Sequence, residues 1–221
     1  MIELQSICKY YNPNKQAALT RALDGVDLTI SEGELVAITG KSGSGKSTLI
    51  NIIGGLDTPT SGSYFFRKQN ILKLSSDKLA EFRNKTVGIV VQNPVLMNEI
   101  SVLENVELPL IIAGRKTAEC EKLAKDALFD VGLENLILRK VYTLSGGEQQ
   151  RVSIARAVVN NPDIIIADEP TGSLDSENAA KIINILKQIN NSGKTVIIVT
   201  HDMDIAAECN RLIVLKDGKI V

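Results

Sequence analysis

The feature that most constrains the fold is a glycine-rich loop set between a strand pattern and a helix pattern. The apolar residues 35–38 lead into Gly40-Lys41-Ser42-Gly43-Ser44-Gly45-Lys46-Ser47-Thr48, and a helix pattern follows over residues 49–53. This is the Gly-x-x-x-x-Gly-Lys-Ser/Thr spacing of a phosphate-binding loop in its strand–loop–helix setting. The alternative, a flexible Gly/Ser connection, does not require this spacing. The stretch therefore predicts an α/β fold that binds a nucleotide.

Each residue type in this loop has a physical reason to be there. Gly40, Gly43 and Gly45 let the backbone curl until successive N–H groups face one point. A helix that begins near Lys46 adds unpaired N–H groups and the positive end of its dipole. The Lys46 ammonium can reach the β- and γ-phosphates, and the Ser47 hydroxyl is placed to ligate Mg²⁺.

Composition excludes several other classes of function. The chain has 221 residues and a formal net charge of −1, so no basic bias recommends nucleic acid as a partner. Cys8, Cys120 and Cys209 are far apart and lack metal-ligand spacing, which favours reduced thiols in a cytosolic protein. We find no apolar run of bilayer length and no signal peptide, so any membrane-spanning part is expected on another chain.

The first thirty residues alternate apolar and polar side chains, which predicts antiparallel strands. Turn-prone residues at Asn12-Pro13-Asn14 and Asp24-Gly25 are predicted to separate these strands. Tyr10 and Tyr11 lie in this part of a chain that has few aromatic residues. One of them can stack on a purine base, but the spacing alone favours packing within a half-buried strand.

Gln92 ends a β-branched run at residues 86–91 and precedes Asn93-Pro94, which opens a loop. A neutral amide at a buried strand end can bond a metal-bound water and swing away from it. It can equally bond only to the backbone of the loop. The residues themselves do not favour either interpretation.

Residues 101–160 carry the spacing of amphipathic helices, which indicates a helical subdomain inserted into the α/β core. Ser145, Gly146 and Gly147 precede one of these helices. They predict a second helix N-terminus with free N–H groups and close access to the backbone. Ser145 can also be a simple helix cap, with the glycines forming the turn.

Acidic residues follow the buried strand that is predicted at residues 164–167. Asp168 and Glu169 point in different directions because side chains alternate along a strand. Asp168 suits a metal ion, and Glu169 suits the polarisation of an attacking water. His201 follows another buried strand, predicted at residues 195–200, and can hydrogen-bond a γ-phosphate there. Asp175 precedes a further amphipathic helix, and residues 211–221 predict a closing hairpin.

Together and in this order, these motifs resemble the ATP-binding subunit of an ATP-binding-cassette (ABC) transporter over the full length of the chain. The resemblance implies a P-loop NTPase with a RecA-like α/β core built on a parallel sheet. It also implies an N-terminal antiparallel β subdomain and an inserted α-helical subdomain. The expected division is a single ABC ATPase domain with its core at residues 1–92 and 161–221 and its helical subdomain at about 93–160.

The resemblance also implies roles for individual residues. Tyr11 is expected to stack on adenine, with Tyr10 the less favoured neighbour. Gln92 is expected to sense metal and water beside a groove for the membrane subunit, Glu169 to be the catalytic base and His201 the γ-phosphate switch. The ATP site comprises Gly40, Ser42, Gly43, Ser44, Gly45, Lys46, Ser47, Thr48 and Asp175, and Mg²⁺ is held by Ser47, Gln92 and Asp168.

In such proteins two copies pair head to tail around ATP. Ser145, Gly146 and Gly147 are therefore expected to contact ATP held by a second copy of the chain. Separate transmembrane permease subunits would place the chain at the cytoplasmic face of the cell membrane.

Residues 55–62 and 103–109 are similar to the branch for lipoprotein release, macrolide export and antimicrobial-peptide resistance. Lys41 and Asn93-Pro94-Val95 depart from the common pattern of that branch. A DNA-repair or chromosome ATPase would carry a long coiled coil, and a translation-linked ABC protein would normally carry two cassettes. An ABC ATPase that signals mechanically to cell-wall enzymes, without transport, remains an alternative.

Overall fold

A parallel sheet forms the centre of the protein. The structure is a computed structural model, and it describes residues 1–11 and 19–221. Within these residues the larger sheet has the strand order β10–β9–β3–β8–β7–β6, with only β10 antiparallel to its neighbour. Its strands are β3 (Leu35–Thr39), β6 (Val87–Val91), β7 (Ile164–Asp168), β8 (Thr195–Val199), β9 (Arg211–Lys216) and β10 (Lys219–Ile220). The expected parallel α/β core is confirmed.

A second, antiparallel sheet lies beside the first and has the order β2–β1–β4–β5. Its strands are β1 (Ile2–Tyr11), β2 (Thr20–Ile30), β4 (Ser61–Phe66) and β5 (Gln69–Asn70). The predicted turn at Asp24-Gly25 is wrong, because β2 runs through it. Gly25 has a φ of 71° at an irregularity of the β1–β2 register, so the glycine permits a bulge rather than a chain reversal. The predicted turn at Asn12-Pro13-Asn14 lies outside the described residues.

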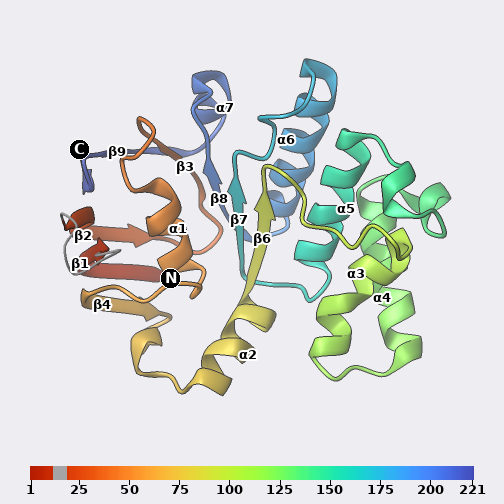
Figure 1. Cartoon of the computed structure of the whole chain (residues 1–221), viewed down its shortest axis with the longest axis horizontal. Coiled ribbons are helices and arrows are strands. Elements are labelled where there is room, and N and C mark those ends of the chain that lie inside the picture. Colours follow the sequence, from red (N-terminus) through yellow and green to blue (C-terminus); the bar gives the residue numbers. More distant parts are fainter. Residues whose placement is uncertain (12–18) are drawn as a thin grey trace.

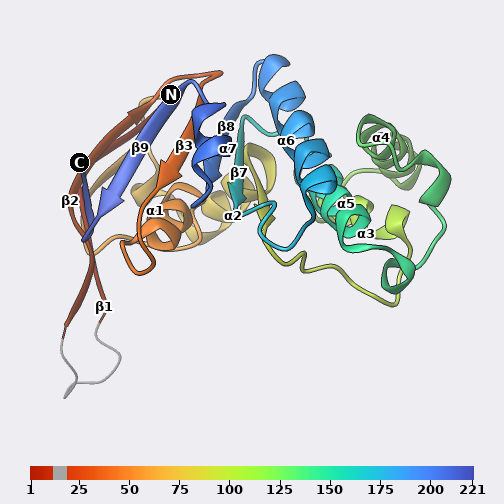
Figure 2. The same ribbon diagram turned by 90° about the horizontal axis from the view of Figure 1, so that it is seen from above.

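The helices form layers on the sheets (Figure 1). They are α1 (Lys46–Ile53), α2 (Ser76–Thr86), α3 (Val102–Ile112), α4 (Thr117–Asp130), α5 (Gly146–Val158), α6 (Ser176–Asn191) and α7 (Met203–Ala207). Short 3-10 helices occur at η1 (Ile71–Lys73), η2 (Glu134–Leu136) and η3 (Val141–Thr143). Figure 2 shows α1 between the two sheets, with α3, α4 and α5 at the opposite end of the molecule. None of the described helices has the length and apolar character needed to cross a bilayer.

Two hydrophobic cores hold these layers together. The first joins both sheets to α1, through residues such as Ile38, Leu49 and Tyr64. The second joins the other face of the parallel sheet to the helices α3–α6. The central strands β3 and β8 are buried along their whole length, which explains their continuous apolar sequence. Burying one valine, leucine or isoleucine side chain, as these strands do, stabilises the fold by about 1.5–3 kcal/mol relative to its exposure.

The helix α5 contacts both the other helices of residues 93–160 and the parallel sheet. It packs on α3 and α4, and it also lies directly on β6. A Cβ at Gly88 of β6 would lie 2.3 Å from the carbonyl oxygen of Ala157, so the glycine is needed for this close approach. The division into a core at 1–92 and 161–221 and a helical subdomain at about 93–160 therefore remains our proposal.

Candidate functional site

One open cleft gathers most of the predicted residues. It has a volume of about 610 Å³ and lies at the carboxyl ends of β3, β6, β7 and β8, where open α/β sheets place their ligands. Its lining is Tyr11, Thr20, Arg21, Ala22, Gly40, Ser42, Gly43, Gly45, Lys46, Ser47, Thr48, Gln92, Asp168, Glu169 and His201. Segments far apart in the sequence thus meet at one edge of the parallel sheet.

The phosphate-binding loop leaves the start of α1 open. Gly45 precedes the helix with a φ of 105°, and no side chain caps the free N–H groups. A Cβ at Gly45 would lie 2.3 Å from the carbonyl oxygen of Ala22, and one at Gly40 would lie 2.2 Å from that of Leu215. Both positions therefore require glycine. The free N–H groups and the dipole of α1 suit an anion.

Lys46 is held over this loop by its own backbone. Its Nζ donates to the carbonyl oxygens of Gly40 at 2.7 Å and Lys41 at 3.1 Å. Among the described residues no carboxylate forms an ion pair with Lys46, so its charge is free to meet a phosphate. Ser44 was expected in the ATP site, but its side chain is buried and, like Lys41, it is not among the described residues that line the cleft. Its Oγ has no hydrogen-bond partner among the described residues.

The two tyrosines separate by strand alternation. Tyr11 lines the cleft, whereas Tyr10, its neighbour on β1, is not among the described residues that line it. The Tyr11 hydroxyl donates to Asp57 Oδ2 at 2.6 Å, and the ammonium of Lys9 lies 4.8 Å from the centre of the Tyr11 ring. Burial and the hydrogen bond to Asp57 raise the pKa of Tyr11. These contacts fix the ring at the mouth of the cleft.

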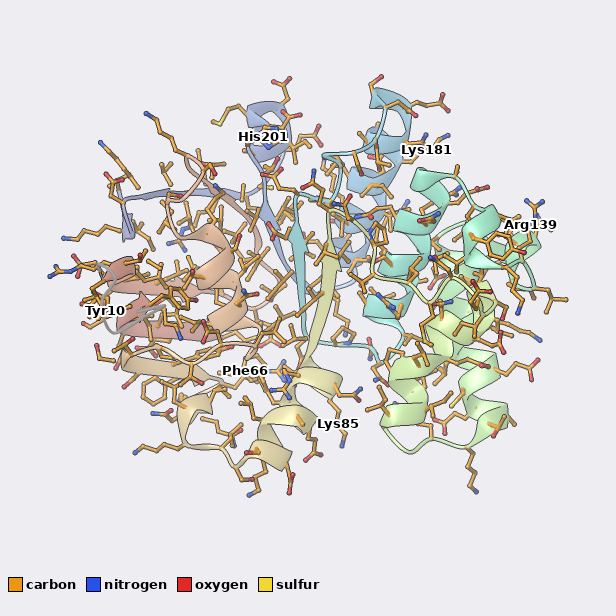
Figure 3. The ribbon with its side chains drawn as sticks, viewed as in Figure 1. Tyr10, Phe66, Lys85, Arg139, Lys181 and His201 are labelled. Atoms are coloured by element: carbon orange, nitrogen blue, oxygen red, sulfur yellow. The ribbon has the colours of Figure 1, made fainter. Side chains whose placement is uncertain are left out.

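Two acids and a histidine meet at the ends of β7 and β8. Burial, and then the nearby Glu169, raise the pKa of Asp168. Glu169 has a φ of 47°, which is rare for a residue other than glycine, and its N–H donates to the carbonyl of Val199 at 2.9 Å. Its Oε2 lies 2.9 Å from His201 Nδ1, and this contact raises the pKa of His201. Figure 3 shows His201 at the upper edge of the sheet.

The cleft also contains a set of oxygen donors that suits Mg²⁺. Ser47 offers a hydroxyl, Gln92 an amide oxygen and Asp168 a carboxylate, and all three line the same cleft. Magnesium prefers oxygen ligands, and a bound cation would offset the cost of burying Asp168 in its charged form. The residues present therefore fit the metal ion.

Ser145, Gly146 and Gly147, which we call the signature residues, lie outside this cleft. Ser145 caps α5 in a capping box, in which its Oγ accepts from the N–H of Glu148 and Glu148 Oε2 accepts from the N–H of Ser145. Gly147 packs against Asn178 of α6, where a Cβ would lie 2.8 Å from Asn178 Oδ1. Asp175 caps α6 and bonds to Asn178 as well. Ser145, Gly146, Gly147 and Asp175 are absent from the described lining of the cleft.

The structure adds residues that the sequence reasoning missed. Thr20, Arg21 and Ala22 line the cleft because β2 pairs with β1, opposite Tyr10 and Tyr11. The Arg21 guanidinium lies 5.8 Å from the centre of the Tyr10 ring. No motif marks these residues. Only the antiparallel register of β1 and β2, which the sequence does not specify, brings them to the site.

The sequence pattern of the family described as "ABC transporter" matches residues 23–172. Proteins named "Macrolide export ATP-binding/permease protein MacB" are similar to this chain. The one from Hyphomonas neptunium is 46% identical over 221 residues, which is 100% of this chain and 34% of the relative. The one from Haemophilus ducreyi is 48% identical and is covered over 32% of its length. The chain thus spans about a third of these curated relatives.

Three solved structures are similar to this chain over most of their own length. The dimeric structure of MJ0796, a bacterial ABC transporter cassette, superposes with a TM-score of 0.91 at 45% identity, covering 100% of this chain and 96% of that one. A post-hydrolysis state of MJ0796 bound to ADP and Pi has the same TM-score at 44% identity and the same coverage. For cbiO1 from Clostridium perfringens the TM-score is 0.88 at 32% identity, covering 100% of this chain and 86% of that one. The chain therefore belongs to the ABC transporter family, as one of its ATP-binding, ATP-hydrolysing cassettes.

Proposed function

We propose that this chain uses Mg²⁺ and ATP to drive export, or extraction from the membrane, of a substrate that passes through separate transmembrane subunits. One observation carries the proposal: a single cleft brings the open start of α1 together with Gln92, Asp168, Glu169 and His201. The similarity to macrolide-export proteins, whose name includes a permease, supports the export branch. Signalling to cell-wall enzymes without transport is the alternative, and no observation specifically favours it.

Binding starts at the phosphates. The N–H groups of the loop and the start of α1 surround the β- and γ-phosphates, and Lys46 exchanges its two backbone carbonyls for phosphate oxygens. Tyr11 stacks on the adenine at the mouth of the cleft. Ser47, Gln92 and Asp168 hold Mg²⁺, which neutralises phosphate charge when bound.

Hydrolysis then needs a base and a contact to the γ-phosphate. Glu169 is the base that takes a proton from the attacking water, a role worth typically about 10²–10⁴ in rate. His201 holds the Glu169 carboxylate at 2.9 Å in this structure. In our proposal His201 turns from Glu169 to the γ-phosphate when ATP binds, which frees the carboxylate to act on water.

The signature residues act on a second copy. Ser145, Gly146 and Gly147 lie outside the cleft of their own chain, which is the arrangement expected if they contact ATP bound to a partner. The dimeric form of the similar MJ0796 cassette supports this assembly. Closure of two copies around ATP is an equilibrium that ATP favours and hydrolysis reverses.

A groove at the amino-terminal half of β6 fits a membrane subunit, although its described lining does not include Gln92. It has a volume of about 520 Å³ and lies between α2, β6, α3 and α5. Leu56 and Ile112 expose 57% and 76% of their surface there. Burial lowers the pKa of Arg156, which also lines the groove and has no ion pair within the described part of the chain. We propose that an apolar segment of the transmembrane subunit docks here, which places the chain at the cytoplasmic face of the membrane.

The mass of the Glu169→Gln protein in solution, with and without ATP and Mg²⁺, tests this proposal. We expect the variant to bind ATP, to lose turnover by about 10²–10⁴-fold and to shift from monomer to dimer. Glu121→Gln, on the exposed face of α4, is the matched control and should turn over ATP normally. Normal turnover by Glu169→Gln would remove Glu169 as the base. A protein that stays monomeric both alone and with its membrane subunit would contradict the ATP-sandwich dimer.

A further inference from the structure

One buried side chain ties the start of α5 to the edge of the nucleotide cleft. Gln150 lies just over one turn after Ser145, and only 1% of its surface is exposed. Its Nε2 donates a 3.1 Å hydrogen bond to the carbonyl oxygen of Val91, the last residue of β6. Gln92 follows Val91 directly and lines the cleft. Gln150 therefore connects the helix of the signature residues to the strand end that carries Gln92.

Other contacts also hold this strand end, and α5 itself packs on β6. β6 is the outermost strand of the parallel sheet, with β7 on one side only, and Val91 is paired with Asp168. Beyond it, the side chain of Gln92 lies close to Gly172, where a Cβ would come within 2.6 Å of Gln92 Nε2. The carbonyl oxygen of Gln92 also accepts a 3.5 Å hydrogen bond from the Ser173 hydroxyl. The bond from Gln150 differs from these contacts because it comes from the helix that begins with Ser145, Gly146 and Gly147.

Only the Nε2 of the Gln150 amide has a hydrogen-bond partner among the described residues. Its Oε1 is sealed from solvent and has no hydrogen-bond partner among the described residues. A buried acceptor without a partner is unfavourable, and an apolar side chain of similar volume would avoid that cost. Among the described residues, the bond from Nε2 to Val91 is the hydrogen bond that offsets part of the cost of burying this amide.

We propose that Gln150 is a positioning residue that couples nucleotide binding in the cleft to the placement of Ser145, Gly146 and Gly147. When Gln92 moves toward bound nucleotide, the carbonyl of Val91 moves with it, and the bond to Gln150 carries that movement to the start of α5. Gln150 itself touches no nucleotide. The inference rests on the proposed function, in which the signature residues contact ATP held by a second copy.

The test measures dimer formation separately from ATP binding. In the Glu169→Gln background, Gln150→Met removes the amide and keeps a flexible side chain of similar size. The ATP concentration that gives half-maximal dimer, measured from the mass in solution, should rise about tenfold, which is within the usual range of coupling between sites. Binding of a fluorescent ATP analogue to dilute monomer should change less than twofold, because the cleft is intact.

Ser153→Ala is the matched control. Ser153 lies on the same buried face of α5, is also 1% exposed and has an Oγ without a partner in the described residues, but it makes no link to β6. We expect this variant to keep the dimerisation midpoint of its parent. A double-mutant cycle with Gln92→Ala adds a second check, because two residues that act through one strand end should show non-additive effects.

The outcomes separate the two proposals. If the Glu169→Gln parent neither binds ATP nor dimerises, the proposed function fails and this inference fails with it. If the parent dimerises and Gln150→Met does so at the same ATP concentration, only the role of Gln150 is overturned. Equal shifts in Gln150→Met and Ser153→Ala, or additive effects with Gln92→Ala, would show that Gln150 is merely structural. Should Gln150→Met fail to fold, Gln150→Asn keeps the polarity, is too short to reach Val91, and is expected to shift the midpoint in the same direction.

Discussion

Two helix N-termini in this protein meet the same physical problem in opposite ways. The start of α1 has a glycine before it and no side-chain cap, so its free N–H groups open into the cleft. The start of α5 is closed by its own residues, since Ser145 and Glu148 form a capping box. The hydrogen bonds from Ser145 lower the pKa of Glu148, so a carboxylate already occupies the positive end of α5.

This difference indicates which of the two helix N-termini should bind phosphate without a second copy of the chain. The start of α1 offers unsatisfied donors and the free charge of Lys46, so it can hold ATP within one chain. The start of α5 carries the carboxylate of Glu148, which competes with a phosphate, and its first turn at residues 146–149 contains no lysine. It should therefore contact ATP only when a second copy presents it. Four changes break or sharpen this comparison.

The largest effect is expected at the open site. Lys46→Ala removes the charge from the start of α1, and ATP affinity should fall about 100-fold, because a hydrogen bond to a charged group contributes up to about 3 kcal/mol. Titration calorimetry with ATP measures this loss. Lys41→Ala is the control, because Lys41 contacts Lys46 only through its backbone carbonyl. Unchanged affinity in Lys46→Ala would contradict the phosphate-loop assignment.

A smaller effect is expected at the capped site. Ser145→Ala removes the cap of α5, which should lower the free energy of unfolding by about 1 kcal/mol. It should also weaken ATP-driven dimerisation in the Glu169→Gln background, while ATP binding to the monomer stays unchanged. Chemical denaturation and the mass in solution measure the two effects. A loss of ATP binding to the monomer would mean that Ser145 serves its own chain.

The carboxylate of the capping box gives a finer comparison. Glu148→Gln keeps a side chain that can reach the N–H of Ser145 but removes the negative charge near the start of α5. We expect the dimer to form at an ATP concentration a few-fold lower, while the fold loses about 0.3–1 kcal/mol from the charge–dipole interaction. Gln149→Glu adds a charge next to it and should act in the opposite direction on dimerisation. A dimer that is weakened in Glu148→Gln would show that the charge assists contact with ATP.

The smallest effect concerns the histidine of the cleft. Because the contact with Glu169 raises the pKa of His201 above its usual 6.5, the pair stabilises the fold fully below that pH. The stabilisation is lost as the pH rises through the raised pKa. His201→Gln should therefore melt slightly below the wild type at about pH 6 and equally at about pH 9. The effect is small, since 75% of the His201 side chain is exposed. A difference that grows at high pH would contradict the pair.

The sequence predicted the elements of the cleft better than their surroundings. The phosphate loop and the strand before Asp168 are local patterns, and each is found where it was expected. The helices predicted after Ser145 and Asp175 are local patterns too, and both are present. The turn at Asp24-Gly25 was wrong because the same glycine conformation serves a turn and a bulge. Only pairing with β1, which is not a local property, decides between them.

The sequence by itself determined that this chain builds an α/β fold with a phosphate-binding loop and acids at a strand end, because spacing and apolar period are written along the chain. The tertiary structure decided the points that these patterns left open. It brought Tyr11 rather than Tyr10 into the cleft, added Arg21 through the register of β2, and joined Gln150 to Val91. The physical reason is that these contacts depend on the packing of segments that are distant in sequence. The local preferences of one segment do not determine which other segment it packs against.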